Sequence, residues 1–162
     1  MTLDKFTIKA QEAVQAAVNI AQQNGQQSIE PVHLLKGVIE KGKDVTNFVF
    51  QKLGVNAQQI DTLVASEIQH LPRVQGGNVY LSNDANKVLT RAQEYATKMG
   101  DEFVSIEPIL LALLDVSSTA SRILHDAGCA EKEMTKAITE LRQGQNVKSQ
   151  SGDENYQALS KY

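Results

Sequence analysis

The sequence predicts an all-α fold in which two copies of a four-helix unit, about eight helices in all, share one core. Three observations support this prediction. Apolar residues recur at helical spacing along most of the chain, the same apolar pattern occurs twice, and no segment shows the sustained alternation of a strand between hairpin turns. With no Trp and only 5% aromatic residues, the core is expected to consist of Leu, Ile, Val and Ala.

The internal repeat is visible when the chain is aligned with itself. Residues 6–25 match residues 81–100 at an offset of 75, including the apolar positions and the closing glycine. The offset then becomes 77, where the Ile-Glu-Pro of residues 29–31 recurs unchanged at residues 106–108. The order in which these features recur indicates two copies of one unit.

The repeat divides the chain into parts. Residues 1–142 are predicted to form one domain, with copy one at about 3–72, copy two at about 79–142, and a connecting loop at 73–79.

Copy one is predicted to contain four helices. Thr7 is a suitable N-cap for the first helix, and Gly25 follows its last periodic apolar residue. Pro31 opens the second helix, because the amide that proline lacks would have no helical partner in a first turn. Gly54 closes the third helix, and the fourth ends before Pro72. Copy two follows the same order, with helices predicted near residues 83–99, 107–115, 118–127 and 131–142.

The last part of the chain differs in composition. Residues 143–162 are rich in Gln, Ser, Asn and Gly and lack a sustained apolar face, so we expect a flexible linker. Tyr156, Leu159 and Tyr162 are three apart, like the start of a further helix. We therefore expect these 162 residues to be the front of a longer protein.

Charge and cysteine content exclude several classes of function. A net charge of −3, with 16 basic and 19 acidic residues and no basic cluster, argues against nucleic acid or an anionic membrane as partner. The single cysteine, Cys129, excludes an internal disulfide and a Cys-rich zinc site and agrees with a reducing cytoplasm. No apolar run reaches the roughly 18 residues that a membrane span needs.

No enzymatic site is predicted. The phosphate-binding string Gly-x-x-x-x-Gly-Lys-Ser/Thr does not occur, so these residues contain no P-loop ATPase site. His33, His70 and His125 are scattered singly, without metal-ligand or nucleophile–base spacing. We expect neither a metal nor a cofactor in this part of the protein.

Several segments carry a resemblance to a known family. They are Leu-Asp-Lys-Phe-Thr at 3–7, Ile-Glu-Pro-Val-His-Leu-Leu at 29–35, His-Leu-Pro-Arg-Val at 70–74, Phe-Val-Ser-Ile-Glu at 103–107, and the tail from 153 to 162. Together with the repeat, they resemble the N-terminal Clp repeat domain of ClpB-type disaggregase chaperones, which are AAA+ proteins. The protease-linked relatives tend to carry Gly-Thr-Glu-His where this chain twice has Ile-Glu-Pro.

The resemblance implies a function in binding rather than chemistry. It implies a monomeric front module that weakly binds unfolded or aggregated polypeptides before an ATP-driven ring threads them. The parent protein would bind ATP and Mg²⁺, form a homohexamer, cooperate with a DnaK-type chaperone system, and lie in the cytoplasm. The alternative is an adaptor- or degron-docking module of a protease-linked Clp ATPase. A helix-turn-helix nucleic-acid binder is disfavoured by the lack of basic residues.

Three polar candidates follow from the resemblance, which places Thr7, Asp101 and Glu107 on a surface used for substrate. Each also has a simpler interpretation. Thr7 suits a helix cap, and Asp101 is a polar residue in a loop. Glu30 and Glu107 are equivalent under the repeat, and each lies next to proline at a helix start, where the helix dipole stabilises a carboxylate. Alternatively, the two are exposed carboxylates that accept cationic groups of a bound chain.

Two apolar candidates lie on the first helix of copy two. Leu89 and Tyr95 are six residues apart. They belong either to the core or to the border of an apolar groove in which a hydrophobic segment docks.

Overall fold

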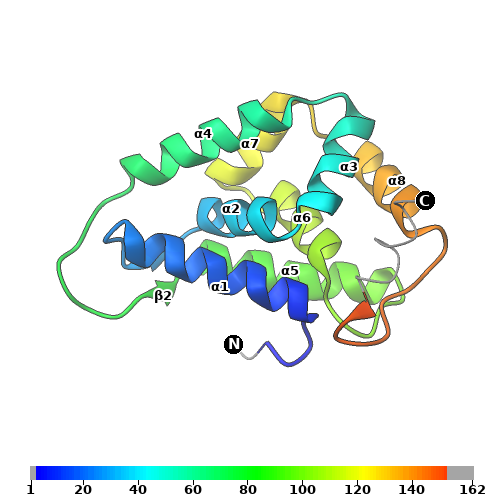
Figure 1. The fold of residues 1–162 in the computed structure, drawn as a ribbon, viewed down its shortest axis with the longest axis horizontal. Helices are drawn as coiled ribbons and strands as arrows, with labels where there is room; N and C mark the ends of the chain where they lie inside the picture. Colours follow the sequence, from blue (N-terminus) through cyan, green and yellow to red (C-terminus); the bar gives the residue numbers. More distant parts are fainter. Residues whose placement is uncertain (1–2, 153–162) are drawn as a thin grey trace.

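The structure, a computed structural model, describes residues 3–152. Within this range the chain forms eight helices and two very short strands (Figure 1), which confirms the predicted all-α fold. In chain order the elements are α1 (Ile8–Gln23), β1 (Ser28–Ile29), α2 (Pro31–Lys41), α3 (Lys43–Leu53), α4 (Ala57–His70), β2 (Tyr80–Leu81), α5 (Asn83–Lys98), α6 (Ile106–Asp115), α7 (Thr119–Ala127) and α8 (Glu131–Arg142). No helix in this range is both long and apolar enough to cross a membrane.

The helix ends follow the repeat. The side chain of Thr7 accepts a hydrogen bond of 3.1 Å from the amide of Ala10, and the equivalent Ser82 accepts one of 3.0 Å from Ala85. These contacts satisfy amides that have no partner within the first turn of α1 and α5. Pro31 opens α2 as predicted. The sequence therefore located these helix starts correctly.

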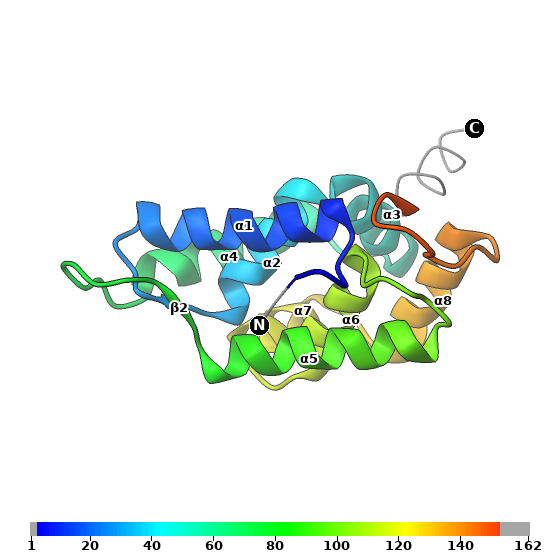
Figure 2. The same cartoon turned by 90° about the horizontal axis from the view of Figure 1, so that it is seen from below.

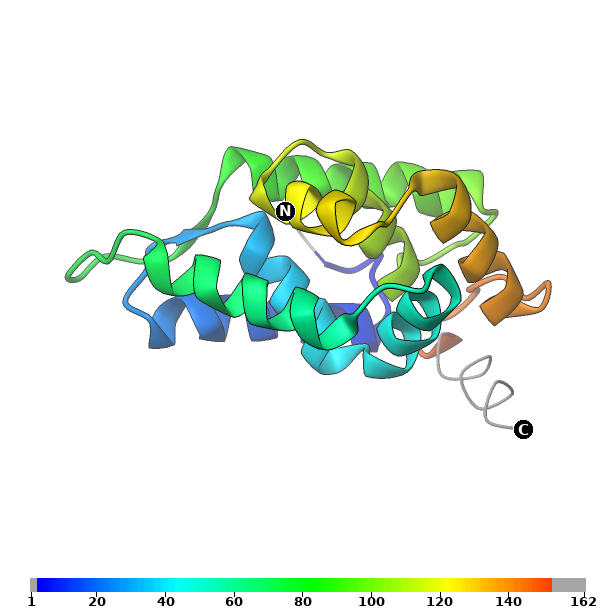
Figure 3. The same cartoon turned by 90° about the horizontal axis from the view of Figure 1, so that it is seen from above.

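The two copies interlock around a central pair of helices. Helix α1 lies on α2, α5 lies on α6, and α2 contacts α6. Figure 2 shows α1 and α5 on opposite sides of the molecule, running in opposite directions. Helix α3 packs on α8, and α4 packs on α7 along one face (Figure 3). Under the repeat, α3 is equivalent to α7 and α4 to α8, so the α3–α8 contact and the α7–α4 contact are equivalent. Both join copy one to copy two, and the copies therefore share a core as predicted.

A close approach between α1 and α2 depends on glycine. A Cβ atom on Gly37 would lie 2.2 Å from the carbonyl oxygen of Ala13, far inside contact distance. Together with the small apolar residues of α1, Gly37 lets the two helix backbones approach closely. This tight pair forms one wall of the core.

The strands are an addition to the prediction. Strand β1 pairs in parallel with β2, so that Ser28 lies opposite Tyr80, and a single bridge joins Phe6 to Val104. Each pairing joins a segment of one copy to a segment of the other. Two-residue strands are too short to show an alternating pattern, so their partners could not be found from sequence.

The segment after α8 returns along the domain. Val147 is buried, and the amide of Ile8 donates to the carbonyl of Gln150. The described part of the expected linker is thus attached to the helical body. The predicted helix start at Tyr156, Leu159 and Tyr162 lies outside the described residues.

Candidate functional site

Thr7 lies inside the fold. It is fully buried, its side chain caps α1, and its amide donates to the carbonyl of Val104 across 2.9 Å. The expectation that Thr7 lies on a surface is therefore wrong, because the bridge between Phe6 and Val104 covers it with copy two.

Asp101 and Glu107 meet a cation at the end of α8. Nη1 of Arg142 lies 2.7 Å from Oδ2 of Asp101, and Nε of Arg142 lies 3.5 Å from Oε1 of Glu107. The Arg142 side chain is 5% exposed and both carboxylates are 0% exposed. Ser105 connects the group, since its hydroxyl accepts from Arg142 and donates to Glu107 across 2.9 Å each.

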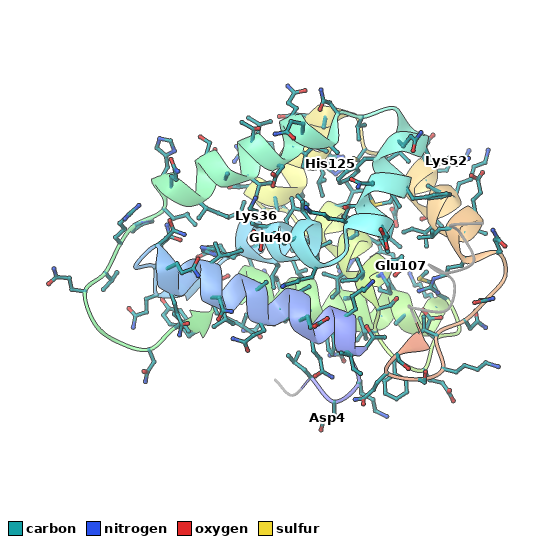
Figure 4. The ribbon with its side chains drawn as sticks, in the orientation of Figure 1. Asp4, Lys36, Glu40, Lys52, Glu107 and His125 are labelled. Carbon is teal, nitrogen blue, oxygen red and sulfur yellow. The ribbon has the colours of Figure 1, made fainter. Side chains whose placement is uncertain are left out.

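This cluster corrects the sequence interpretation. Figure 4 shows Glu107 enclosed among the helices, whereas Asp4 projects at the edge of the molecule. The expectation that Asp101 and Glu107 are available on the surface is wrong, because the buried Arg142 compensates their charge. Sequence reasoning missed Arg142. A basic residue in the last turn of a helix is ordinarily explained by the helix dipole, so no sequence pattern indicated that Arg142 pairs with buried carboxylates.

Glu30 occupies the equivalent position in copy one but has different surroundings. The hydroxyl of Ser28 donates to its carboxylate across 2.7 Å, as Ser105 does for Glu107. The backbone amide of Glu30 donates to Nδ1 of His33. Glu30 is only partly buried, and its side of α2 faces a hollow of about 100 Å³. Of the two equivalent residues, Glu30 is partly exposed and lines a hollow, whereas Glu107 is fully buried.

The Glu30 hollow combines carboxylates with apolar surface. Glu67 and Asp84 line the hollow of about 100 Å³ together with Glu30. An adjoining hollow of about 220 Å³ shares Glu30 and Leu71, and its other lining residues include Val74 and Tyr80, which are 50% and 55% exposed. We use the name Glu30 hollow for both together.

Leu89 and Tyr95 differ in their surroundings. Leu89 is fully buried in the core, so the expectation that it borders an open groove is wrong. Tyr95 is half-buried, and its hydroxyl donates to Glu131 of α8 across 2.8 Å. Burial, then this hydrogen bond, raises the pKa of Tyr95. The Nζ atom of Lys98 lies over the face of the Tyr95 ring, 5.7 Å from its centroid.

A second hollow follows the outer side of α5. Its volume is about 580 Å³, and Arg91 and Glu94 of α5 line it together with Asp115 of α6. Arg91 contacts both acidic residues. Arg91 and Asp115 lie close enough to Tyr95 to act on its pKa, so Tyr95 lies near these charged residues.

His33 and Cys129 are buried in the fold. Burial lowers the pKa of His33, although the nearby Glu30 acts in the opposite direction. Burial raises the pKa of the Cys129 thiol to about 11, so the thiol stays protonated at neutral pH. Among residues 3–152 no three or more His, Cys, Asp or Glu side chains are placed to hold a metal ion.

Taken together, the helices and their internal repeat define the class of all-α repeat domains. The model of the Clp repeat (R) N-terminal domain family matches residues 5–127. The chain belongs to this family.

Known proteins support the assignment. The chain is 58% identical over 162 residues to the chaperone protein ClpB of Bacteroides thetaiotaomicron, covering all of this chain and 19% of that relative. The crystal structure of the Hsp104 N-terminal domain from Candida albicans has a TM-score of 0.81 at 24% identity, covering 93% of this chain and 99% of that one. The N-terminal domain of ClpD from Arabidopsis thaliana has a TM-score of 0.67 at 23% identity, covering 89% and 98%. The chain is thus a Clp chaperone N-terminal domain rather than an AAA+ ATPase domain.

Proposed function

We propose that this domain weakly binds unfolded or aggregated polypeptides and passes them to the ATP-driven threading ring of a ClpB-type disaggregase. The observation that carries the proposal is the 58% identity to a ClpB chaperone along the whole chain. The Glu30 hollow supplies a surface of suitable chemistry. The chain spans 19% of that relative's length, so the threading ring is itself part of the proposal.

The chemistry of the Glu30 hollow suits an unfolded chain. Unfolded proteins expose apolar side chains together with Lys and Arg. Tyr80 and Val74 offer apolar surface, while Glu30, Glu67 and Asp84 offer negative charge. A hollow of this size covers much less area than a standard protein interface, so we expect a Kd of about 10 μM to 1 mM.

The six candidate residues divide into two groups under this proposal. Glu30 and Tyr95 are partly exposed, so we propose that they contact the bound chain directly. The other four have buried side chains, so we assign them no contact with the bound chain: Thr7, Leu89, Asp101 and Glu107.

The properties of the parent protein complete the proposal. We expect this domain to be a monomer and the parent to be a homohexamer that binds ATP and Mg²⁺ and cooperates with a DnaK-type chaperone system. We expect the cytoplasm as its location, in agreement with the buried free thiol of Cys129.

The test is an NMR titration of the domain with casein, a polypeptide that is unfolded under native conditions. We expect shifts around the Glu30 hollow, and we expect Tyr80→Ser to weaken binding about three- to tenfold by removing apolar contact. Tyr95→Ser tests the proposed contact between Tyr95 and the bound chain, and we expect it to weaken binding as well. Ile8→Ser removes a side chain of similar exposure, 48% against 55%, at the start of α1 and serves as the control.

The outcomes are distinct. Equal affinity of the wild type, Tyr80→Ser and Tyr95→Ser would contradict binding at these surfaces. No binding of casein at 1 mM, together with binding of a folded adaptor protein, would favour the adaptor-docking alternative. The ClpD likeness, at 23% identity, supports the shared fold only and does not favour that alternative.

A further inference from the structure

The segment that follows α8 is fastened to copy two. Val147 is 0% exposed and belongs to the hydrophobic core. Its amide donates to Oδ1 of Asp101 across 3.0 Å, and its carbonyl accepts from the amide of Glu102 across 2.8 Å. An apolar side chain and both backbone polar groups of one residue are thus engaged.

The same segment is also fastened to the start of copy one. The carbonyl of Gln150 accepts from the amide of Ile8 across 2.7 Å, and the Gln150 side chain donates to the carbonyl of Asp4 across 3.2 Å. Figure 2 shows this segment running from the end of α8 to the start of α1. Residues 145–150, which we call the strap, therefore cross from one copy to the other.

Asp101 connects the strap to the buried charge cluster. Its Oδ1 atom accepts from the amide of Val147 and also from Nη1 of Arg142, at 3.0 and 2.9 Å. Arg142 is the last residue of α8 and lies three positions before the first residue of the strap. One carboxylate thereby holds both the helix end and the segment that leaves it.

We propose that Asp101 is the anchor of a docking site for the strap, so that the domain binds its own exit segment and fixes the direction in which the chain leaves. The ligand of this site is a backbone amide with an adjacent apolar side chain. In the longer protein proposed above, release of the strap would let the ring reorient relative to the domain. This role does not depend on polypeptide binding at the Glu30 hollow.

Two amides outside the strap report on whether it is docked. Ile8 is the first residue of α1, so its amide has no partner within the helix and depends on Gln150. Glu102 lies in a loop, and its amide depends on Val147. Hydrogen exchange at these amides therefore measures strap opening, while amides inside α1 measure global unfolding.

The experiment compares amide exchange by NMR in four forms of the 162-residue chain. Asp101→Asn removes the charge of the anchor, Val147→Asp removes the apolar side chain of the strap, and the wild type is the reference. Asp61→Asn is the matched control, because Asp61 forms an ion pair with Lys36 at 2.7 Å away from the strap. We expect exchange at Ile8 and Glu102 to become about tenfold faster or more in both strap variants, and by a larger factor than exchange at the α1 interior amides.

Each outcome bears on the proposal. Unchanged exchange at Ile8 and Glu102 in a folded variant would overturn it. If Asp101→Asn does not fold, Val147→Asp decides, and unfolding of both variants would contradict a locally opening strap. Casein affinity is measured in parallel. Strap release with normal casein binding supports the strap alone, so the two proposals fail separately.

Discussion

The imidazole of His33 accepts a hydrogen bond at Nδ1 from the amide of Glu30, with 2.8 Å between the two nitrogens. This contact places the proton of the neutral ring on Nε2, which donates to the side chain of Gln26 across 2.7 Å. Gln26 in turn donates to the carbonyl of Ile68 at the end of α4. The buried ring thus joins the start of α2 to α4, and the network has no place for a second ring proton.

This network predicts a loss of stability in mild acid. Burial lowers the pKa of His33 in the folded state, so below about pH 6.5 the unfolded state binds more protons. The contribution of His33 to the free energy of unfolding is complete above that pH. It is lost as the pH falls towards the pKa of His33 in the folded state. Urea unfolding between pH 5.5 and 7.5 measures how steeply the free energy of unfolding changes with pH. We expect His33→Gln to flatten this dependence on pH. Equal slopes in the wild type and His33→Gln would contradict this role.

Replacement of the two equivalent caps should cost similar amounts of stability. Thr7→Ala and Ser82→Ala each remove the acceptor for a first-turn amide, so each is expected to lower the free energy of unfolding by about 0.5–2 kcal/mol. Urea unfolding gives both values. Because Thr7 is buried, we also expect Thr7→Ala to leave casein affinity within about twofold of the wild type. A folded Thr7→Ala variant that no longer binds casein would instead indicate contact with substrate.

Gly37→Ala should be destabilising, although alanine ordinarily favours a helix. Helix propensity alone predicts a gain of about 1 kcal/mol. In this fold the new Cβ atom would meet the carbonyl of Ala13, so we expect a loss of about 1–3 kcal/mol as α1 and α2 separate. Thermal and urea unfolding decide the sign. Asn47→Ala, at an exposed position of α3, is the control for propensity. A stabilised Gly37→Ala variant would show that the helices separate at little cost.

Removal of the buried cation should have a large effect. Arg142→Met leaves the carboxylates of Asp101 and Glu107 buried without this partner, and we expect a loss of about 3–5 kcal/mol. Lys36→Met removes a partly exposed ion pair with Asp61, whose side chains are 21% and 33% exposed, and should cost about 1 kcal/mol or less. Both are measured by urea unfolding under the same conditions. Similar losses in the two variants would contradict a special role for burial.

Much of the fold could be predicted because its determinants are local. Thr7 and Ser82 begin helices through contacts within one turn, and Pro31 restricts the backbone of its own first turn. The repeat then showed that two such units share one core. The pairing of β1 with β2 could not be predicted, since it joins residues far apart in the chain and involves only two residues on each side.

The sequence by itself determined the helices, their order, the repeat and the family to which the chain belongs. Only the tertiary structure decided which candidate residues reach solvent. Glu30 and Glu107 share the motif Ser-Ile-Glu-Pro, yet one lines a hollow and the other is buried. The difference comes from Arg142, which follows Asp101 by 41 residues and compensates the buried charge. Because the free energy of a carboxylate depends on the charges that surround it in space, no local pattern could separate the two.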